Sequence, residues 1–470
     1  MTFYIDWFFV ISFQKRLNFI QCKSKHKNLS TEIQTMLTKI VNNRELFKRH
    51  AWRFHFTAGQ EWRVTRRKRI QRELKMQRRT LMKAALTAVT LTALQATTAL
   101  AENTVLKIGF VGVTSGPAAA WGISNQRSME ARAAWINETG GYTIGGTTYD
   151  IEIVSFDDQK DPKRAIAGME KMAQEGIHYV VGPNVDDGAA AVRPVAESNG
   201  IMYFPYAFPK SLYQAPASNA VLGMVANYQS GPAIYKYLMD EKGVKTVAFI
   251  AANESDPLSQ RDGGVEAATA LGMEVVSANV TYQVDTTDFT PVLTPVMRSR
   301  PDLLVLSGVS PANAPQLIRS ARELGFQGVI STETAQDAGV LAEGAGDLAN
   351  GFISVGGAST PELASPMMNE FVQRYTDMFG EYNDESNTKV YALEYILETL
   401  KADPSAINDV DAFQATMDTF EAPNPYMNGD AKLRYVGMSS FGQKRQVSVP
   451  LVVNVYQDGA FETLFVAEVD

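Results

Sequence analysis

The sequence predicts an α/β protein whose main part forms two doubly wound parallel-sheet lobes. Short apolar strands alternate with helical segments from residue 104 onward, a pattern typical of parallel sheets that helices cover on both faces. The alternation restarts after Asn227, so residues 104–226 and 227–353 each have about the length of one lobe. The rest of the chain is mostly helical and ends in a hairpin, which indicates that it crosses between the lobes more than once.

The first series of elements is bounded by capping and turn signals. Asp161 precedes Pro162, which places a capping carboxylate before a proline in the first helical turn. Gly140-Gly141 and Gly176 end the helices before them. We expect strands over residues 105–113, 149–156, 178–181 and 201–204, and helices over residues 124–137, from 161 to 176, and 188–198.

The second series repeats this order. We expect strands over residues 246–251, 273–276, 303–306, 328–330 and 351–357, a loop over 253–259, and helices over 230–241, from that loop to 271, 289–298 and 312–324. The tail predicts helices over residues 366–379, 388–401 and 410–417, then strands over 447–457 and 461–469 joined by Asp458-Gly459.

The N-terminal part differs sharply in charge from the rest. Residues 1–101 hold 20 Lys and Arg against 5 Asp and Glu, whereas residues 102–470 hold 24 against 46. Residues 76–101 have the parts of a cleaved secretory signal: basic Arg78, Arg79 and Lys83, an uncharged stretch, and Ala99-Leu100-Ala101 before Glu102. The two arginines fit a twin-arginine or an ordinary Sec signal. We interpret residues 1–75 as an upstream extension wrongly joined to the chain, with Met76 as the start.

Residues 102–470, the part after the predicted signal, carry few groups suited to catalysis. The only Cys is Cys22, and His178 is the only His after residue 101, so neither a thiol nucleophile nor a Ser-His-Asp triad is expected. No spacing of His, Cys or carboxylates predicts a metal site, and no glycine-rich phosphate loop follows a strand. We therefore expect no cofactor and no metal. The acidic balance also argues against nucleic acid as a partner.

Candidate binding residues follow the strands. Ligands of open parallel sheets bind beyond the carboxyl ends of the strands. Paired acids there could cap a helix instead, and aromatics could simply pack, so both readings stay open. The candidates are Thr114, Ser115, Trp121, Asn184, Asp186, Asp187, Tyr206, Phe208, Asn253, Glu254, Asp256, Ser307, Ser310 and Glu333.

Four stretches together resemble the periplasmic leucine/isoleucine/valine-type solute-binding proteins of ABC transporters. They are LKIGFVGVTSGPAAAWG, FDDQKDPKRAIAGMEKMAQEGIHYVVGP, GIMYFPYAFP and PQLIRSARELGFQGVIS. The resemblance implies a type I periplasmic binding protein fold with three hinge crossings, near Asn227, 351–357 and 443–447. Lobe 1 would then comprise residues 102–226 and 354–445, and lobe 2 residues 227–353 and 446–470.

The resemblance also implies site residues. In members with amino-acid ligands, lobe 1 holds the ligand carboxylate at positions that match Asp187 (or Asp186), Tyr206 and Phe208, and a lobe 2 acid that matches Glu333 holds the ammonium group. The chain departs from the family where acids replace hydroxyls, and where Asp256 stands in place of an aromatic residue. This weakens the case for a branched-chain amino acid and makes an amide, urea or an amine plausible.

The expected function is capture of such a small polar solute in the periplasm, for delivery to membrane permease subunits by an expected monomer. A hydrolase or a receptor-type sensor on the same two-lobed fold is the alternative.

Overall fold

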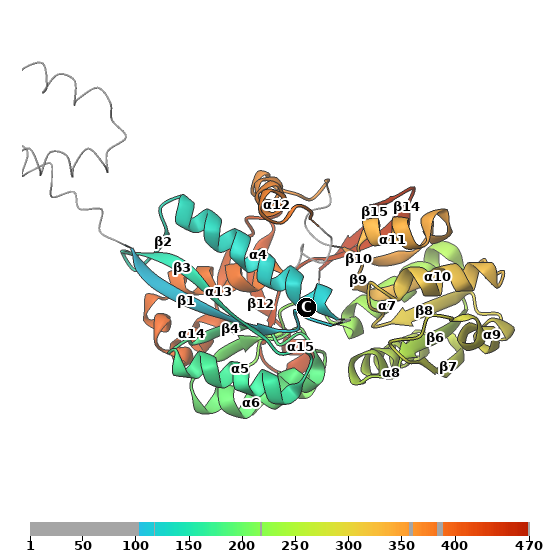
Figure 1. Ribbon diagram of the computed structural model, residues 1–470, viewed down its shortest axis with the longest axis horizontal. Coiled ribbons are helices and arrows are strands. Elements are labelled where there is room, and N and C mark those ends of the chain that lie inside the picture. Colours follow the sequence, from blue (N-terminus) through green and yellow to red (C-terminus); the bar gives the residue numbers. More distant parts are fainter. Residues whose placement is uncertain (1–102, 117, 217–218, 357–360, 383–388, 469–470) are drawn as a thin grey trace, which may run out of the picture. The chain divides into compact units, whose positions relative to one another are not determined.

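A computed structural model describes residues 103–116, 118–216, 219–356, 361–382 and 389–468 (Figure 1). The predicted extension over residues 1–75 and the predicted signal over 76–101 lie outside the described residues. Among the described helices, none combines the length and the hydropathy that a membrane span requires.

The first lobe is built on a five-stranded sheet in the order β2-β3-β1-β4-β5. The strands β1, β3, β4 and β5 run parallel, and β2 pairs antiparallel with β3 at the edge. Their bounds are β1 Thr104–Gly112, β2 Tyr142–Ile144, β3 Thr147–Asp157, β4 Tyr179–Val181 and β5 Met202–Phe204.

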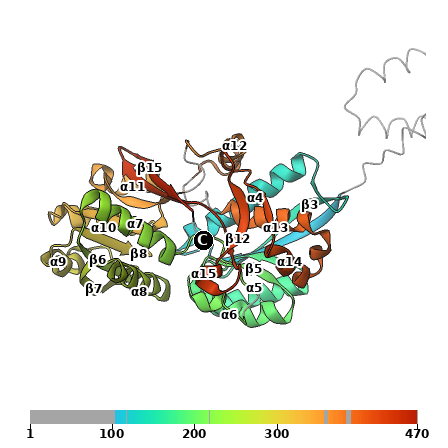
Figure 2. The ribbon, with the colours of Figure 1, turned by 180° about the vertical axis from the view of Figure 1, so that it is seen from behind.

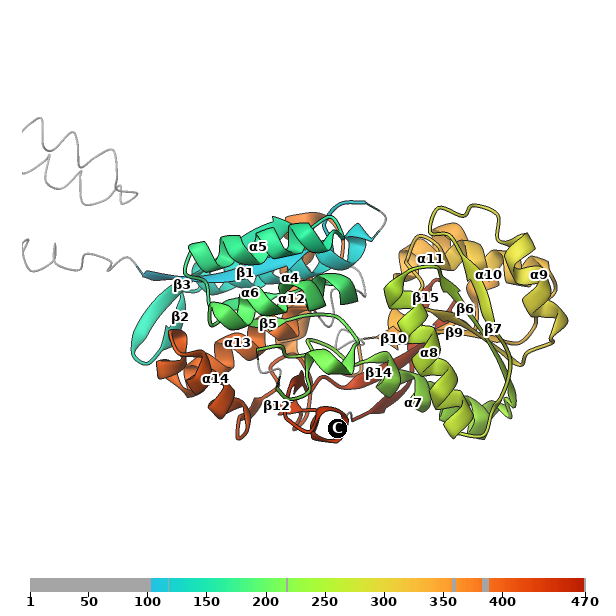
Figure 3. The same cartoon turned by 90° about the horizontal axis from the view of Figure 1, so that it is seen from below.

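Helices cover both faces of this sheet, as a doubly wound lobe requires. One face packs against α4 (Ala119–Glu138) and the later helices α12 to α14, and the other packs against α5 (Pro162–Gln174) and α6 (Asp186–Ser198). Figure 3 shows α5 and α6 lying along one side of β1 and β5. The start of α5 confirms the predicted capping, because the Asp161 carboxylate accepts a hydrogen bond from the Lys163 N–H at 2.8 Å.

The second lobe is built on a seven-stranded sheet in the order β15-β14-β10-β9-β8-β6-β7. The strands β6 to β10 are parallel, whereas the terminal hairpin of β14 and β15 joins antiparallel to β10. The bounds are β6 Thr246–Ala252, β7 Glu274–Tyr282, β8 Leu303–Ser307, β9 Val329–Ala335, β10 Ile353–Gly356, β14 Leu451–Gln457 and β15 Ala460–Ala467. The helices α7 (Asn227–Lys242) and α8 (Ser255–Ala270) pack on one face, and α9 (Thr290–Arg298), α10 (Ala314–Glu323) and α11 (Ala338–Gly344) pack on the other.

The returning chain completes the first lobe. The helices α12 (Pro366–Phe379), α13 (Val390–Ala402) and α14 (Val410–Met417) pack against α4 and the first sheet, next to a small sheet of β11 (Glu421–Pro423), β12 (Lys432–Val436) and β13 (Gln446–Val447). Three short turns of helix, η1 (Lys210–Leu212), η2 (Gly346–Ala349) and η4 (Pro404–Ile407), and α15 (Met438–Phe441) complete the described elements. Figure 2 shows α13, β12 and α14 gathered on the first lobe.

A buried ion pair ties this return to α4. Arg132 of α4 donates from Nε to Glu394 of α13 at 2.9 Å, and the hydroxyl of Tyr426 donates to the same carboxylate at 2.8 Å. Both partners of a buried pair need such bonds, because burial removes their hydration.

The chain crosses between the lobes three times, as expected: between β5 and α7, after β10, and between β13 and β14 (Figure 3). The predicted lobe boundaries at residues 354 and 446 lie too early along the chain. Residues 354–356 belong to β10 in the second sheet, and residues 446–447 form β13, which pairs with β12.

Three predicted elements of lobe 2 have wrong lengths. The helix α8 begins at Ser255, inside the predicted loop, because Asp256 and Pro257 form its first turn. The strands β7 and β9 extend to Tyr282 and Ala335, well past their predicted ends. The extra residues of β9 are polar except Ala335, so they lack the apolar run that marks a strand in the sequence, and the last three of them line the cleft.

Candidate ligand-binding cleft

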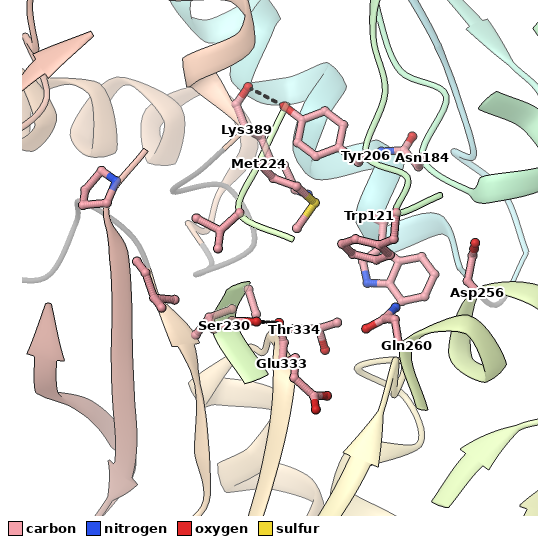
Figure 4. Close-up of a pocket in the computed structure, with 17 residues that line it drawn as sticks. Trp121, Asn184, Tyr206, Met224, Ser230, Asp256, Gln260, Glu333, Thr334 and Lys389 are labelled. Carbon is pink, nitrogen blue, oxygen red and sulfur yellow. Dashed lines mark hydrogen bonds between the residues drawn. The ribbon is translucent and has the colours of Figure 1, made fainter. Parts of the chain in front are cut away.

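A cavity opens between the lobes, at the carboxyl ends of the parallel strands. The empty space between its walls, open solvent at the mouth included, is about 790 Å³. Both lobes and the hinge segments contribute, as Figure 4 shows. Lobe 1 supplies Trp121, Asn184, Tyr206, Phe208 and Lys389; lobe 2 supplies Ser230, Asp256, Gln260, Glu333, Thr334 and Ala335; the hinges supply Met224, Val225, Val355, Gly356, Pro450 and Leu451.

The lobe 1 wall of the cavity is aromatic. Trp121 lies in the first turn of α4, and Tyr206 and Phe208 follow β5. The Lys389 ammonium lies 4.1 Å from the centroid of the Tyr206 ring, a cation–π contact. The Tyr206 hydroxyl donates to the Lys389 carbonyl oxygen at 3.4 Å, so Lys389 contacts both the ring and the hydroxyl of this tyrosine.

Several buried polar atoms of the cavity have no hydrogen-bond partner in the protein. Both amide atoms of Asn184, Oε1 of Gln260 and Oε2 of Glu333 are in this state. An unsatisfied buried polar atom costs about 1–3 kcal/mol, so native structures rarely keep one without a reason. A bound polar solute would satisfy atoms from both lobes at once.

Glu333 lies in the middle of β9, whereas the sequence predicted a loop after the strand. Its carboxyl is buried, and Oε1 accepts a hydrogen bond from the Tyr235 hydroxyl of α7. Figure 4 shows this side chain running away from Trp121 and Tyr206 into lobe 2, with the Glu333 carbonyl accepting from the Ser230 hydroxyl at 3.5 Å. Burial raises the pKa of Glu333 to about 7, against the opposing bond from Tyr235.

Two aspartates meet across the cleft. The Asp186 N–H at the start of α6 donates to Oδ1 of Asp256 in α8 at 2.8 Å, and both side chains are buried. The Asp186 carboxyl also accepts from the Phe208 N–H at 2.9 Å. Burial raises the pKa of both carboxyl groups.

A sequence profile of the periplasmic binding protein family matches residues 105–443. The chain belongs to this family.

Individual members of the periplasmic binding protein family resemble the chain more distantly. The Leu/Ile/Val-binding protein of Escherichia coli (strain K12) is 28% identical over 258 residues, which cover 52% of this chain and 67% of that protein. Two solved structures share the fold at 19% identity. A branched-chain amino acid transporter substrate-binding protein of Streptococcus pneumoniae, in complex with isoleucine, has a TM-score of 0.65 and covers 78% of this chain and 99% of its own. An ABC transporter solute-binding protein of R. palustris, in complex with 4-hydroxybenzoate, has a TM-score of 0.63. The match covers 78% of this chain and 97% of that protein's chain.

Six of the fourteen candidate residues line one cavity of this periplasmic binding protein: Trp121, Asn184, Tyr206, Phe208, Asp256 and Glu333. The other candidates do not line it. Asp186 sits behind Asp256, and Asp187 is exposed, where it accepts from the Ser255 hydroxyl at 3.0 Å. Ser115 lines a neighbouring cavity and donates to Asp157 at 2.7 Å. Ser307 is buried and lines neither of these two cavities.

Sequence reasoning missed several cavity residues. Lys389 lies in the returning chain, far in sequence from every parallel strand. A search of the segments that follow parallel strands therefore does not find it. Ser230 and Gln260 lie on helices rather than in loops. The position of Ser230 just after the first crossing was the one available signal, because hinge segments border an interlobe cleft.

Proposed function

We propose that this protein captures a small solute with an amino or amide group beside an apolar portion, and delivers it in the periplasm to the permease of an ABC transporter. The observation that carries the proposal is the set of unpartnered buried amide atoms on Asn184 of lobe 1 and Gln260 of lobe 2, two residues that line one cavity from opposite sides. The aromatic side chains of Trp121 and Phe208 offer a surface for the apolar portion.

The polar groups of the cavity favour such a solute. Asn184 supplies an amide that can donate and accept, and Gln260 supplies an acceptor oxygen. A solute with an amino or amide group would find an acceptor on each lobe. The Asp186 carboxyl accepts a hydrogen bond from the Phe208 N–H, and the Asp256 carboxyl accepts one from the Asp186 N–H, which supports a structural role for both residues beside the solute.

The test is thermal melting of the full chain with isoleucine, 4-hydroxybenzoate, benzylamine, acetamide, urea and putrescine. A solute at 100 times its Kd adds about 2.7 kcal/mol of stability, so a rise in Tm identifies it. We expect a rise with an amino acid, an amine or an amide. A rise with 4-hydroxybenzoate alone would contradict the proposed class.

A matched variant localises the binding. Gln260→Met removes the unpartnered Oε1, so we expect the Tm of the free protein to hold while the solute-induced rise shrinks. Asp240→Asn, exposed on α7 and paired with Lys236 of the same helix, serves as the control and should keep the full rise. If NMR shows that the bound solute is recovered unchanged, the protein captures it and does not hydrolyse it. Delivery is tested by comparing uptake of the labelled solute in cells with and without the protein.

A further inference from the structure

The N-terminal turns of α6 and α8 meet across the cleft through acidic side chains. Asp186 of lobe 1 is 5% exposed and Asp256 of lobe 2 is 6% exposed. The Asp186 N–H reaches Asp256 Oδ1 at 2.8 Å, so the two acidic residues are in direct contact across the cleft. Two acids from different lobes are thus buried against one another wherever the lobes adopt this arrangement.

We propose that closing the cleft takes up one proton from solvent, which the carboxyl groups of Asp186 and Asp256 then share across the lobes. The proposal goes beyond solute capture, because it concerns the closing step itself and holds whichever solute is bound. In the open form both carboxyls would face water and ionise at ordinary pH. In the closed form two adjacent carboxylates would repel each other in a buried setting, and a shared proton turns this repulsion into a hydrogen bond.

The direction of the pH dependence follows from this difference. Burial raises the pKa of both groups in the closed form above the value in water. The closed form therefore binds the extra proton and is favoured at low pH. Its advantage is lost as pH rises above the open-state pKa, by up to about tenfold in the closed-to-open ratio per pH unit for one proton.

In the described part of the chain, no neighbouring cation neutralises the two carboxylates of Asp186 and Asp256 in place of the shared proton. Lys160 lowers the pKa of Asp256 by attraction, but its ammonium is engaged with Glu254 at 2.5 Å. The Phe208 N–H favours the ionised form of Asp186 alone, while the neighbouring Asp187 opposes it. The other titratable groups facing Asp186 are the hydroxyls of Tyr213 and Tyr228, whose pKa values burial raises, so they remain neutral. Among the described residues, no group of His, Cys, Asp and Glu is arranged to hold a metal ion instead.

The test measures the distance between the lobes without any solute. The full chain with Cys22→Ser carries spin labels at Gln174→Cys, at the exposed end of α5, and Glu323→Cys, at the exposed end of α10. Double electron–electron resonance between pH 5 and pH 8 then gives the populations of short and long distances. We expect the long distance to gain population as pH rises.

Two variants tie the effect to the acid pair. Asp256→Asn cannot ionise and its amide can donate to Asp186, so we expect the short distance to persist up to pH 8. Asp186→Asn should behave in the same way, and Asp240→Asn, exposed on α7 with its partner Lys236 in the same helix, should behave like the unsubstituted chain. Circular dichroism checks that each variant is folded. Equal distance distributions at pH 5 and pH 8 in the unsubstituted chain would overturn the proposal, as would an undiminished pH effect in both Asn variants. Because no solute is present, neither outcome depends on the proposed function.

Discussion

Glu333 is a buried acid whose environment favours its neutral form. Its ordinary pKa of 4.5 rises to about 7 through burial, with the Tyr235 hydroxyl as the partner of one oxygen. A folded-state pKa above the unfolded value means that the folded protein binds the extra proton. The resulting stability is fully present below pH 4.5 and is lost as pH rises through 7. The loss at pH 8 is about 3 kcal/mol at most.

Replacement by glutamine should remove this dependence. We expect Glu333→Gln to gain up to about 3 kcal/mol of unfolding free energy relative to the unsubstituted chain between pH 4.5 and pH 8. Urea denaturation without solute at both pH values measures it. The exposed Asp187→Asn is the control. A constant difference between Glu333→Gln and the unsubstituted chain across this range would show that folding does not raise the pKa of Glu333.

At the level of residues, the sequence identified the right strand ends but not the direction of each side chain. Trp121, Tyr206 and Phe208 follow strands of the first lobe and reach the cavity. Glu333 was assigned to a loop, because Ser331, Thr332 and Thr334 interrupt the apolar run although all three are buried. Lys389 could not be found from local pattern, because its position depends on how the returning chain folds back onto lobe 1.

The element that positions Trp121 is the first turn of α4, which lies unusually close to β1. A Cβ atom on Gly122 would lie 1.9 Å from the carbonyl oxygen of Val113, so only glycine permits this approach. The atom in the way belongs to the backbone, and relief would require a shift of the whole turn that carries Trp121.

We expect Gly122→Ala to lower the unfolding free energy by about 1–3 kcal/mol through this overpacking, and to reduce the Tm rise that a bound solute produces. Gly231→Ala in α7 is the matched control, because its nearest neighbours are atoms of the Tyr235 side chain at 3.4 Å, an ordinary van der Waals contact. Urea denaturation and thermal melting compare the two. Equal stability in both variants would mean that the turn adjusts freely.

Elements with their own capping signals were predicted best. The helices over Pro366–Phe379 and Val410–Met417 match their predicted bounds, and each begins with a capping Ser365 or Asp409. The start of α8 was missed because Glu254, its capping position, makes no side-chain cap bond, and Pro257 suggested a loop. Lobe boundaries were missed by a few residues, because β10 and β13 are defined by partners distant in the chain.

At the scale of the whole molecule, a small set of polar contacts on one edge of the cleft joins the two lobes. Lys160 of lobe 1 pairs with Glu254 of lobe 2 at 2.5 Å, beside the contacts of Asp186 with Asp256 and of Asp187 with Ser255. The side chains of Lys160 and Glu254 are 29% and 34% exposed. Partly exposed pairs contribute about 0–1 kcal/mol and weaken as salt screens them.

Lys160→Gln should therefore shift the lobes modestly toward the open form. We expect the closed-to-open ratio to fall by up to about fivefold at low salt, as a loss of about 1 kcal/mol implies, and the difference to vanish in about 1 M salt, where the screening length is about 3 Å. Spin-label distances between the lobes at pH 5 measure this ratio. Lys171→Gln is the control, since its partner Glu175 lies in the same lobe at 3.9 Å. An effect of Lys160→Gln that persists in high salt would mean that Lys160 acts by packing or by holding its loop, rather than by its charge.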